Sequence, residues 1–282
     1  MPRLLVLDID GTLLDPSDIV TPVVHNAIAA ARAAGVEVAL ATGRRLRSAR
    51  RIVNEVGIRV PLVLSNGALI WSTEREEVMN QITFSPEMLG FIVEEALKDE
   101  LAPVLMQGPK RGERLVVPEN APQPEFVNAF IGRRMDEVDI LPAGKLGATP
   151  EVLTVDVFGP EDALRSLTSR FTARGFSAFH SGPFGMDPTF SHWAANIHMP
   201  GVSKASGVAL LAADLGLTMH DVVAVGDGEN DLPMLEAAGL GVAMGNASDY
   251  VRARADAVVR GHDEDGVAEA IERFVLHPAA AN

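Results

Sequence analysis

The stretch "VLDIDGTLL" (Val6–Leu14) places two carboxylates directly after a run of apolar residues. The apolar run predicts a buried β-strand that ends here. Alternate side chains of a strand share one face, so Asp8 and Asp10 are expected to point to the same side. Two like charges are tolerated there if a cation binds, if one carboxylate is protonated, or if both face water. The stretch therefore predicts a charged site at the tip of a buried strand.

Two more strands follow along the chain, each separated from the previous one by a helix. A helix is predicted from Pro22, with Thr21 as its N-cap, to a stop at Gly35. The strand "VEVALATG", the helical stretch "RLRSARRIVNEVG" and the strand "PLVLSNG" come next. This alternation predicts an α/β fold with a Rossmann-like, doubly wound parallel sheet, which binds ligands at the carboxyl ends of its strands.

The same pattern returns near the C-terminus. A strand is predicted at "AANIHM" (Ala194–Met199), followed by a helix that carries Lys204 in its first turn. The segment "DVVAVGDGENDLPMLEAAG" (Asp221–Gly239) predicts strand, loop and helix, and "GVAM", "GNAS" and "DGVAEAIERFVL" predict a strand, a loop and a final helix. We expect these segments to complete the same sheet.

The middle of the chain has a different texture, with most of the irregularly placed prolines and with short helical and strand patterns in alternation. An inserted α/β cap domain explains this change best. The predicted organisation is a discontinuous core of residues 1–83 and 188–282 that surrounds an inserted domain of residues 84–187.

Composition restricts the class of protein. The 282 residues are 47% hydrophobic, enough for a full core, and the formal net charge of −14 disfavours nucleic acids and anionic membranes as partners. The absence of cysteine excludes disulfides, thiolate zinc sites and cysteine nucleophiles. No stretch approaches the roughly 20 apolar residues of a membrane span. Asp8 interrupts the N-terminal apolar run before a signal peptide is complete, so a cytoplasmic protein is expected. The sequence does not indicate an oligomeric state.

Acidic residues are predicted to gather at one edge of the sheet. Asp8, Asp10, Asp227 and Asp231 all follow predicted strands, and their mutual repulsion calls for a hard divalent cation. Oxygen ligands with several retained waters favour Mg²⁺.

Donors and a positive charge are expected beside these carboxylates. Thr42 and the Gly43 amide follow the second strand, and Lys204 lies near a helix N-terminus. Together with Mg²⁺ they describe a pocket for a phosphoryl group, where an aspartate can act as the nucleophile.

The motifs "LDIDGTLL", "ATGR", "SNGA", "HMPGVSKASG", "GDGENDLPML" and "VAMGNAS" follow one another along the whole chain. In this order they resemble the haloacid dehalogenase superfamily, specifically its Cof-like branch of phosphatases with a large inserted α/β cap. The resemblance implies that Asp8 is the nucleophile and a metal ligand. It implies that Asp10 is the general acid and base, and that its backbone carbonyl binds the metal.

The same resemblance assigns the remaining site residues. Phosphoryl oxygens would be bound by the Ile9 amide, Thr42, Gly43, Lys204 and Asn230. Asp227 would bind the metal directly, and Asp231 would act on it through one of the metal's ligands or through a water molecule. Arg44 and Asn66 are candidate substrate contacts, although Asn66 is better explained as a turn residue than as a substrate contact.

The function expected from these residues is a Mg²⁺-dependent phosphatase that acts on a small phosphorylated metabolite, with sugar phosphates the commonest class in the family. A phosphomutase or another phosphotransferase of the same superfamily is an alternative. A phosphometabolite-binding protein without turnover is a third, and the intact Asp8 and Asp10 pair argues against it. The sequence does not choose between water and another acceptor.

Overall fold

The computed structural model describes residues 2–57, 61–122, 127–128, 131–132, 135–184 and 192–277. The chain divides into two compact units. The first combines Met1–Asn80 with Ser203–Asn282, and the second is the contiguous segment Gln81–Val202. The first unit is therefore interrupted by one contiguous insertion.

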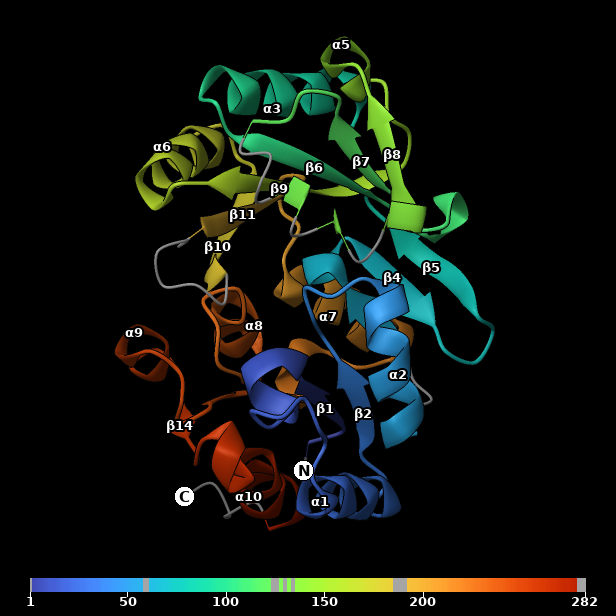
Figure 1. The fold of residues 1–282 in the computed structure, drawn as a ribbon. Coiled ribbons are helices and arrows are strands. Elements are labelled where there is room, and N and C mark those ends of the chain that lie inside the picture. Colours follow the sequence, from blue (N-terminus) through green and yellow to red (C-terminus); the bar gives the residue numbers. More distant parts are fainter. Residues whose placement is uncertain are drawn as a thin grey trace. The chain divides into compact units, whose positions relative to one another are not determined.

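The first unit is built on a parallel sheet with the strand order β14-β13-β12-β1-β2. Its strands are β1 (Leu4–Leu7), β2 (Glu37–Leu40), β12 (Val222–Gly226), β13 (Leu240–Ala243) and β14 (Ala257–Val258). Strands β1 and β2 lie side by side in Figure 1. All four residues of β1 are fully buried, because this strand lies inside the sheet with both faces covered. The predicted doubly wound parallel sheet is confirmed.

A three-stranded sheet, in which β3 and β4 are antiparallel, adjoins the end of β2. It consists of β3 (Leu62–Leu64), β4 (Leu69–Ser72) and β5 (Glu77–Gln81). A parallel bridge between Ala41 and Val63 places β3 beside the residues that follow β2. The turns after β1, β2 and β3 are thereby brought to the same edge.

Six α-helices belong to the described part of this unit, and side-chain caps fix the start of several of them. They are α1 (Pro22–Ala33), α2 (Leu46–Val56), α7 (Lys204–Asp214), α8 (Leu232–Ala237), α9 (Asp249–Arg252) and α10 (Gly266–Ile271). The Thr21 side chain accepts a hydrogen bond from the Val24 amide, which confirms the predicted cap. Ser203 and Ser206 form reciprocal caps that fix the start of α7.

The second unit has a six-stranded sheet with the order β10-β11-β9-β6-β7-β8. Its strands are β6 (Ala102–Gln107), β7 (Leu115–Pro118), β8 (Val138–Leu141), β9 (Val152–Gly159), β10 (Ser177–Phe184) and β11 (His192–His198). The neighbouring strands are antiparallel except for β7 and β8.

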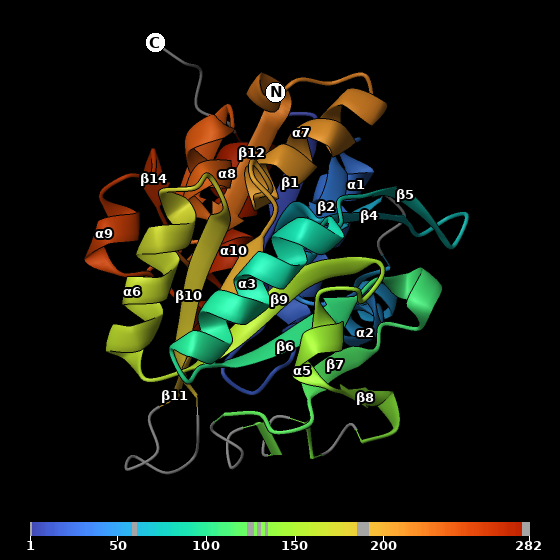
Figure 2. The ribbon, with the colours of Figure 1, turned by 90° about the horizontal axis from the view of Figure 1, so that it is seen from above.

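Two longer helices cover one face of this second sheet. α3 (Pro86–Lys98) and α6 (Glu161–Thr172) lie over its strands, and a short helix, α5 (Ala143–Leu146), follows β8 (Figure 2). Phe171 of α6 meets Phe91 of α3 edge to face, with ring centroids 5.7 Å apart. These contacts give the inserted unit a hydrophobic core of its own.

One predicted strand belongs to the other sheet. Residues 194–199 were expected in the parallel core, but β11 pairs with β9 and β10 in the inserted unit. The alternation within β11 explains this placement, because Ala195 and Ile197 enter the core whereas Asn196 and His198 lie on the opposite face. The compact insertion accordingly runs to residue 202 rather than 187, and residues 188–191 lie outside the described residues.

Within the described residues, no helix combines the length and the apolar character that a membrane crossing requires.

The fully buried His198 makes the stability of the fold depend on pH. Its Nδ1 atom lies 3.4 Å from Thr154 Oγ1, and burial lowers the pKa of His198 to about 4. The unfolded chain binds this proton near pH 6.5 and the folded chain does not, so stability falls as the pH drops from about 6.5 to about 4. Above about pH 6.5 His198 is neutral in both the folded and the unfolded chain, so it causes no loss of stability there.

We therefore expect His198→Gln to flatten the loss of stability between pH 7 and pH 5. Wild type should lose about 2 kcal/mol more unfolding free energy than the variant over this interval, as measured by urea denaturation. Both proteins contain the same carboxylates, so the effect of carboxylate titration on the free energy of unfolding cancels when the two proteins are compared. His25→Gln, at an exposed position of α1, is the matched control and should follow wild type. Equal losses in His198→Gln and wild type would contradict this assignment.

Candidate active site

Three carboxylates meet at the carboxyl end of the parallel sheet. Asp8 follows β1, and Asp227 and Asp231 follow β12, which pairs with β1 in parallel so that Leu7 lies opposite Val225. One oxygen from each of the three carboxylates lies within 4.8 Å of the others. Asp8 and Asp231 are buried and Asp227 is partly buried. The aligned strand ends thus produce a compact acidic cluster.

Lys204 enters this cluster from the first turn of α7. Its Nζ donates to Asp8 Oδ1 and to Asp231 Oδ1, each at 2.6 Å, and its side chain is only 1% exposed. Burial alone would lower the pKa of Lys204, but the two carboxylates outweigh it and raise that pKa. The lysine therefore stays charged and links two strand-end loops to the helix.

One ammonium does not neutralise three carboxylates. Burial raises the pKa of Asp8 well above its usual range; Asp231 and Asp227 add to this effect and Lys204 opposes it. Burial likewise raises the pKa of Asp227 to about 6. An excess of negative charge in a low-dielectric site is the condition that a divalent cation relieves, and the donor set consists of carboxylate oxygens. The cluster therefore fits a hard cation such as Mg²⁺.

Close backbone contact allows Lys204 to reach the cluster. Gly67 has φ +97°, and a Cβ there would lie 2.1 Å from the Ser203 carbonyl oxygen. A Cβ on Gly207 would lie 2.4 Å from the Val63 side chain. Both glycines are needed where the turn after β3 packs against the start of α7.

Asp231 has both of its carboxylate oxygens occupied. Oδ1 accepts from Lys204, and Oδ2 accepts from the amides of Asp227 at 3.0 Å and Gly228 at 2.9 Å. These bonds hold the loop after β12 in a tight turn. Asp231 therefore shapes the acidic cluster as well as contributing charge to it.

Asp10 lies apart from the other three carboxylates. The strand ends at Leu7, and the chain turns within Ile9–Leu13, where Gly11 has φ +78°, so the alternation expected from the sequence does not extend to Asp10. The Asp10 side chain is 57% exposed and accepts a hydrogen bond at 2.8 Å from Arg44 Nε. The prediction that four carboxylates meet is therefore wrong for Asp10, and Arg44 contacts this carboxylate.

The residues predicted to bind phosphate are connected to one another. The buried Thr42 accepts from the Arg44 amide at 3.0 Å, and Asn230 Nδ2 donates to Asn66 Oδ1 at 3.0 Å. A Cβ on Gly43 would lie 3.2 Å from Asn66 Oδ1. Asn66 itself has φ +52° and makes the turn after β3. The phosphate-binding roles of these residues and of Ile9 stay predictions.

Thr12 is a site residue that the predicted set omits. Its buried hydroxyl donates to Asp227 Oδ1 at 2.7 Å and so ties the loop after β1 to the loop after β12. The neighbouring Gly11 has φ +78°, and a Cβ there would lie 2.4 Å from Asp227 Oδ2. The position of this threonine, directly after Asp10 and Gly11 at the end of a predicted strand, is the sequence feature that could have indicated its role.

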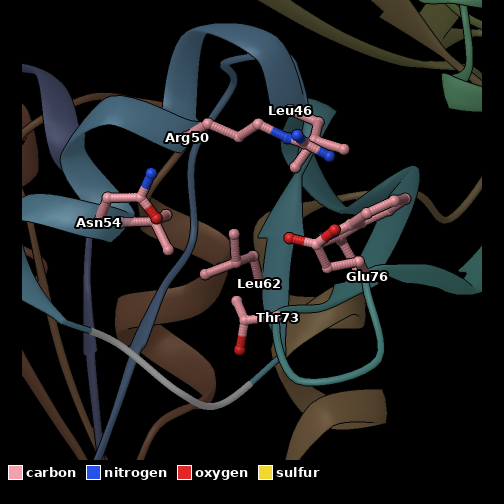
Figure 3. Close-up of a pocket in the computed structure, with 8 residues that line it drawn as sticks. Leu46, Arg50, Asn54, Leu62, Thr73 and Glu76 are labelled. Carbon is pink, nitrogen blue, oxygen red and sulfur yellow. The ribbon is translucent and has the colours of Figure 1, made fainter.

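A separate cavity of about 70 Å³ lies between α2, β3 and β4 (Figure 3). Arg50 lies over the Trp71 ring, 5.7 Å from its centroid. The cavity is lined by Leu46, Arg50, Val53, Asn54, Leu62, Trp71, Thr73 and Glu76. None of the predicted site residues is among them, so the cavity is distinct from the acidic cluster.

Comparison with known proteins places this arrangement in a family. The haloacid dehalogenase-like hydrolase family matches residues 5–271. A putative phosphatase of Bacillus subtilis, YxeH, is 31% identical, with 98% of this chain and 99% of that protein covered. The 5-amino-6-(5-phospho-D-ribitylamino)uracil phosphatase YcsE of the same organism is 29% identical, with 97% and 96% covered.

A solved structure gives the same assignment. The phosphatase BT1666 of Bacteroides thetaiotaomicron superposes with a TM-score of 0.79 and 26% identity, covering 96% of this chain and 94% of that one. The likeness extends through both units, so the parallel core and the insertion are found together in this fold. The chain is a member of the haloacid dehalogenase-like hydrolases, in the Cof-like branch, and is a phosphoric monoester hydrolase.

Proposed function

We propose that this protein is a Mg²⁺-dependent phosphatase that hydrolyses a small phosphomonoester through an aspartyl-phosphate on Asp8. The observation that carries the proposal is the buried Lys204 ammonium, which holds Asp8 beside Asp227 and Asp231. Relatives of the chain that are named as phosphatases support the reaction class, and the ribitylamino-uracil phosphate substrate of YcsE is a small phosphorylated metabolite.

Asp8 is suited to act as the nucleophile. Its Oδ1 is fixed by Lys204, and no donor within the described part of the chain hydrogen-bonds to its Oδ2. In the proposed first step, Oδ2 forms a bond to phosphorus while the bond from phosphorus to the ester oxygen breaks. In the second step water attacks the phosphoryl group, and the Asp8 carboxylate and inorganic phosphate are released.

Asp10 is suited to move the protons. Its exposed carboxylate lies two residues after the nucleophile, where it would protonate the leaving oxygen and later take a proton from the attacking water. Arg44 holds this carboxylate through Nε at 2.8 Å, so we propose that it orients Asp10 until substrate arrives.

The phosphoryl oxygens would be bound by groups at the ends of several strands. Donors available there are the Lys204 ammonium, the Thr42 hydroxyl, the Asn230 amide and the backbone amides of Ile9 and Gly43. Asp8, Asp227 and the Asp10 carbonyl would hold Mg²⁺, with Asp231 reaching it through water. The cation would neutralise charge on the phosphoryl group and lower the repulsion between it and Asp8.

Substrate selectivity is proposed to reside in the inserted unit. The residues of the parallel core recognise a phosphoryl group and a cation, which every phosphomonoester offers, so discrimination requires contacts to the leaving group. A sugar phosphate is the proposed class of substrate, and a cytoplasmic location stays a prediction.

Removal of the cation should abolish turnover. We expect hydrolysis of p-nitrophenyl phosphate to stop in chelator and to return when Mg²⁺ is added in excess. Asp227→Ala should raise the Mg²⁺ concentration for half-maximal activity by at least the roughly 10- to 100-fold typical of losing an outer-shell partner. Glu229→Ala, at an exposed position of the same loop, is the control and should behave as wild type. Full turnover in chelator would contradict the metal assignment.

The two carboxylates of the first loop should have separable functions. Asp8→Asn keeps the shape of the side chain but removes the nucleophile, so no phosphoenzyme should be trapped by acid quench and detected by intact-protein mass spectrometry. Asp10→Asn should slow hydrolysis of an alkyl phosphate by about 10²- to 10⁴-fold and of p-nitrophenyl phosphate by less, because an activated leaving group needs less proton transfer. Wild-type turnover by Asp8→Asn would refute covalent catalysis.

A further inference from the structure

The loop after β13 contacts the loop after β1 through the side chain of Asn246. Asn246 Nδ2 donates to the Gly11 carbonyl oxygen at 2.9 Å, and Asn246 Oδ1 accepts from the His262 amide at 3.0 Å. A carbonyl only accepts and a backbone amide only donates, so the two partners fix the orientation of the Asn246 amide. One exposed side chain therefore connects the loops after β1, β13 and β14.

His262 provides a second contact to the same loop. Its Nδ1 lies 2.7 Å from the Leu14 carbonyl oxygen, and since that oxygen only accepts, Nδ1 carries the proton. The loop of residues 11–14 is thus held at both ends by the chain that follows β13.

Loop 11–14 contacts both oxygens of Asp227. Thr12 donates to Oδ1 at 2.7 Å, and the Gly11 Cα packs so closely that a Cβ would lie 2.4 Å from Oδ2. The position of Gly11 therefore limits where the carboxylate that would bind the cation can lie. The Asn246 hydrogen bond acts on the backbone of that glycine.

We infer that Asn246 is a positioning residue that sets the affinity of the acidic cluster for a divalent cation, acting through Gly11 on Asp227. This inference rests on the proposed function, because it takes Asp227 as a ligand of Mg²⁺. Asn246 does not touch the cluster, so its removal should weaken cation binding and leave the chemistry at saturating cation intact. The residue links cation affinity to the loop after β13.

The test is a calorimetric titration of Mg²⁺ into the full chain without substrate. We expect Asn246→Ala to bind Mg²⁺ about fivefold more weakly than wild type or worse, a loss toward the low end of outer-shell effects. Ser248→Ala is the matched control, since it removes one hydrogen bond, the cap of α9, from the same loop without touching loop 11–14. Ser248→Ala should bind Mg²⁺ within about twofold of wild type. It should nevertheless lose about as much thermal stability as Asn246→Ala does.

Kinetics provide the second measurement. With p-nitrophenyl phosphate, the Mg²⁺ concentration for half-maximal rate should rise in Asn246→Ala by the calorimetric factor, and kcat at saturating Mg²⁺ should stay within about twofold. If Asn246→Ala does not fold, Asn246→Asp keeps the acceptor for His262 and lacks the donor for Gly11. It should bind Mg²⁺ more weakly than wild type, although an added negative charge alone would strengthen binding.

The outcomes separate this inference from the proposed function. Wild-type affinity in Asn246→Ala, a loss of affinity equal to that of Ser248→Ala, or unchanged or tighter binding by Asn246→Asp would overturn the positioning role. Wild type that binds Mg²⁺ without hydrolysing any phosphomonoester would overturn the proposed function and leave the inference standing on the calorimetry. Wild type that binds no Mg²⁺ would overturn both.

Discussion

The buried ammonium of Lys204 between Asp8 and Asp231 is the interaction on which the site depends. Burying an unpaired carboxylate costs several kcal/mol, and the ammonium held inside the acidic cluster offsets part of this cost for Asp8 and Asp231. That requirement explains the glycines at 67 and 207, which let the first turn of α7 approach the strand ends. It also leaves excess negative charge in the cluster, which favours a divalent cation.

Local signals made most of the parallel core predictable. Apolar strands, the Thr21 cap and the first-turn position of Lys204 depend on neighbouring residues, and the structure has each of them in place. The meeting of Asp8, Asp227 and Asp231 follows because parallel strands end at one edge. The direction of Asp10 did not follow from alternation, because the strand stops at Leu7 and the chain then turns within Ile9–Leu13.

Other features depend on contacts between distant residues. Residues 194–199 have the apolar content of a strand, but which sheet they join is decided by pairing with β9 and β10. Thr12 and Asp227 are 215 positions apart, and Gly11 and Asn246 are 235 apart. A single sequence carries no signal for such pairs unless a motif already names them. The residues that orient the site were therefore harder to predict than the residues expected to react.

The insertion also has a consequence for how the protein is made. Asp8 and Lys204 are 196 positions apart, so at about 5 to 20 residues per second the ribosome needs roughly 10 to 40 s to supply the second after the first. At the end of this interval residues 81–202 have all been synthesised, whereas β1 still lacks its neighbour β12. The inserted unit can fold first, and although β1 can pair with β2 on one side, its other edge stays unpaired until β12 emerges.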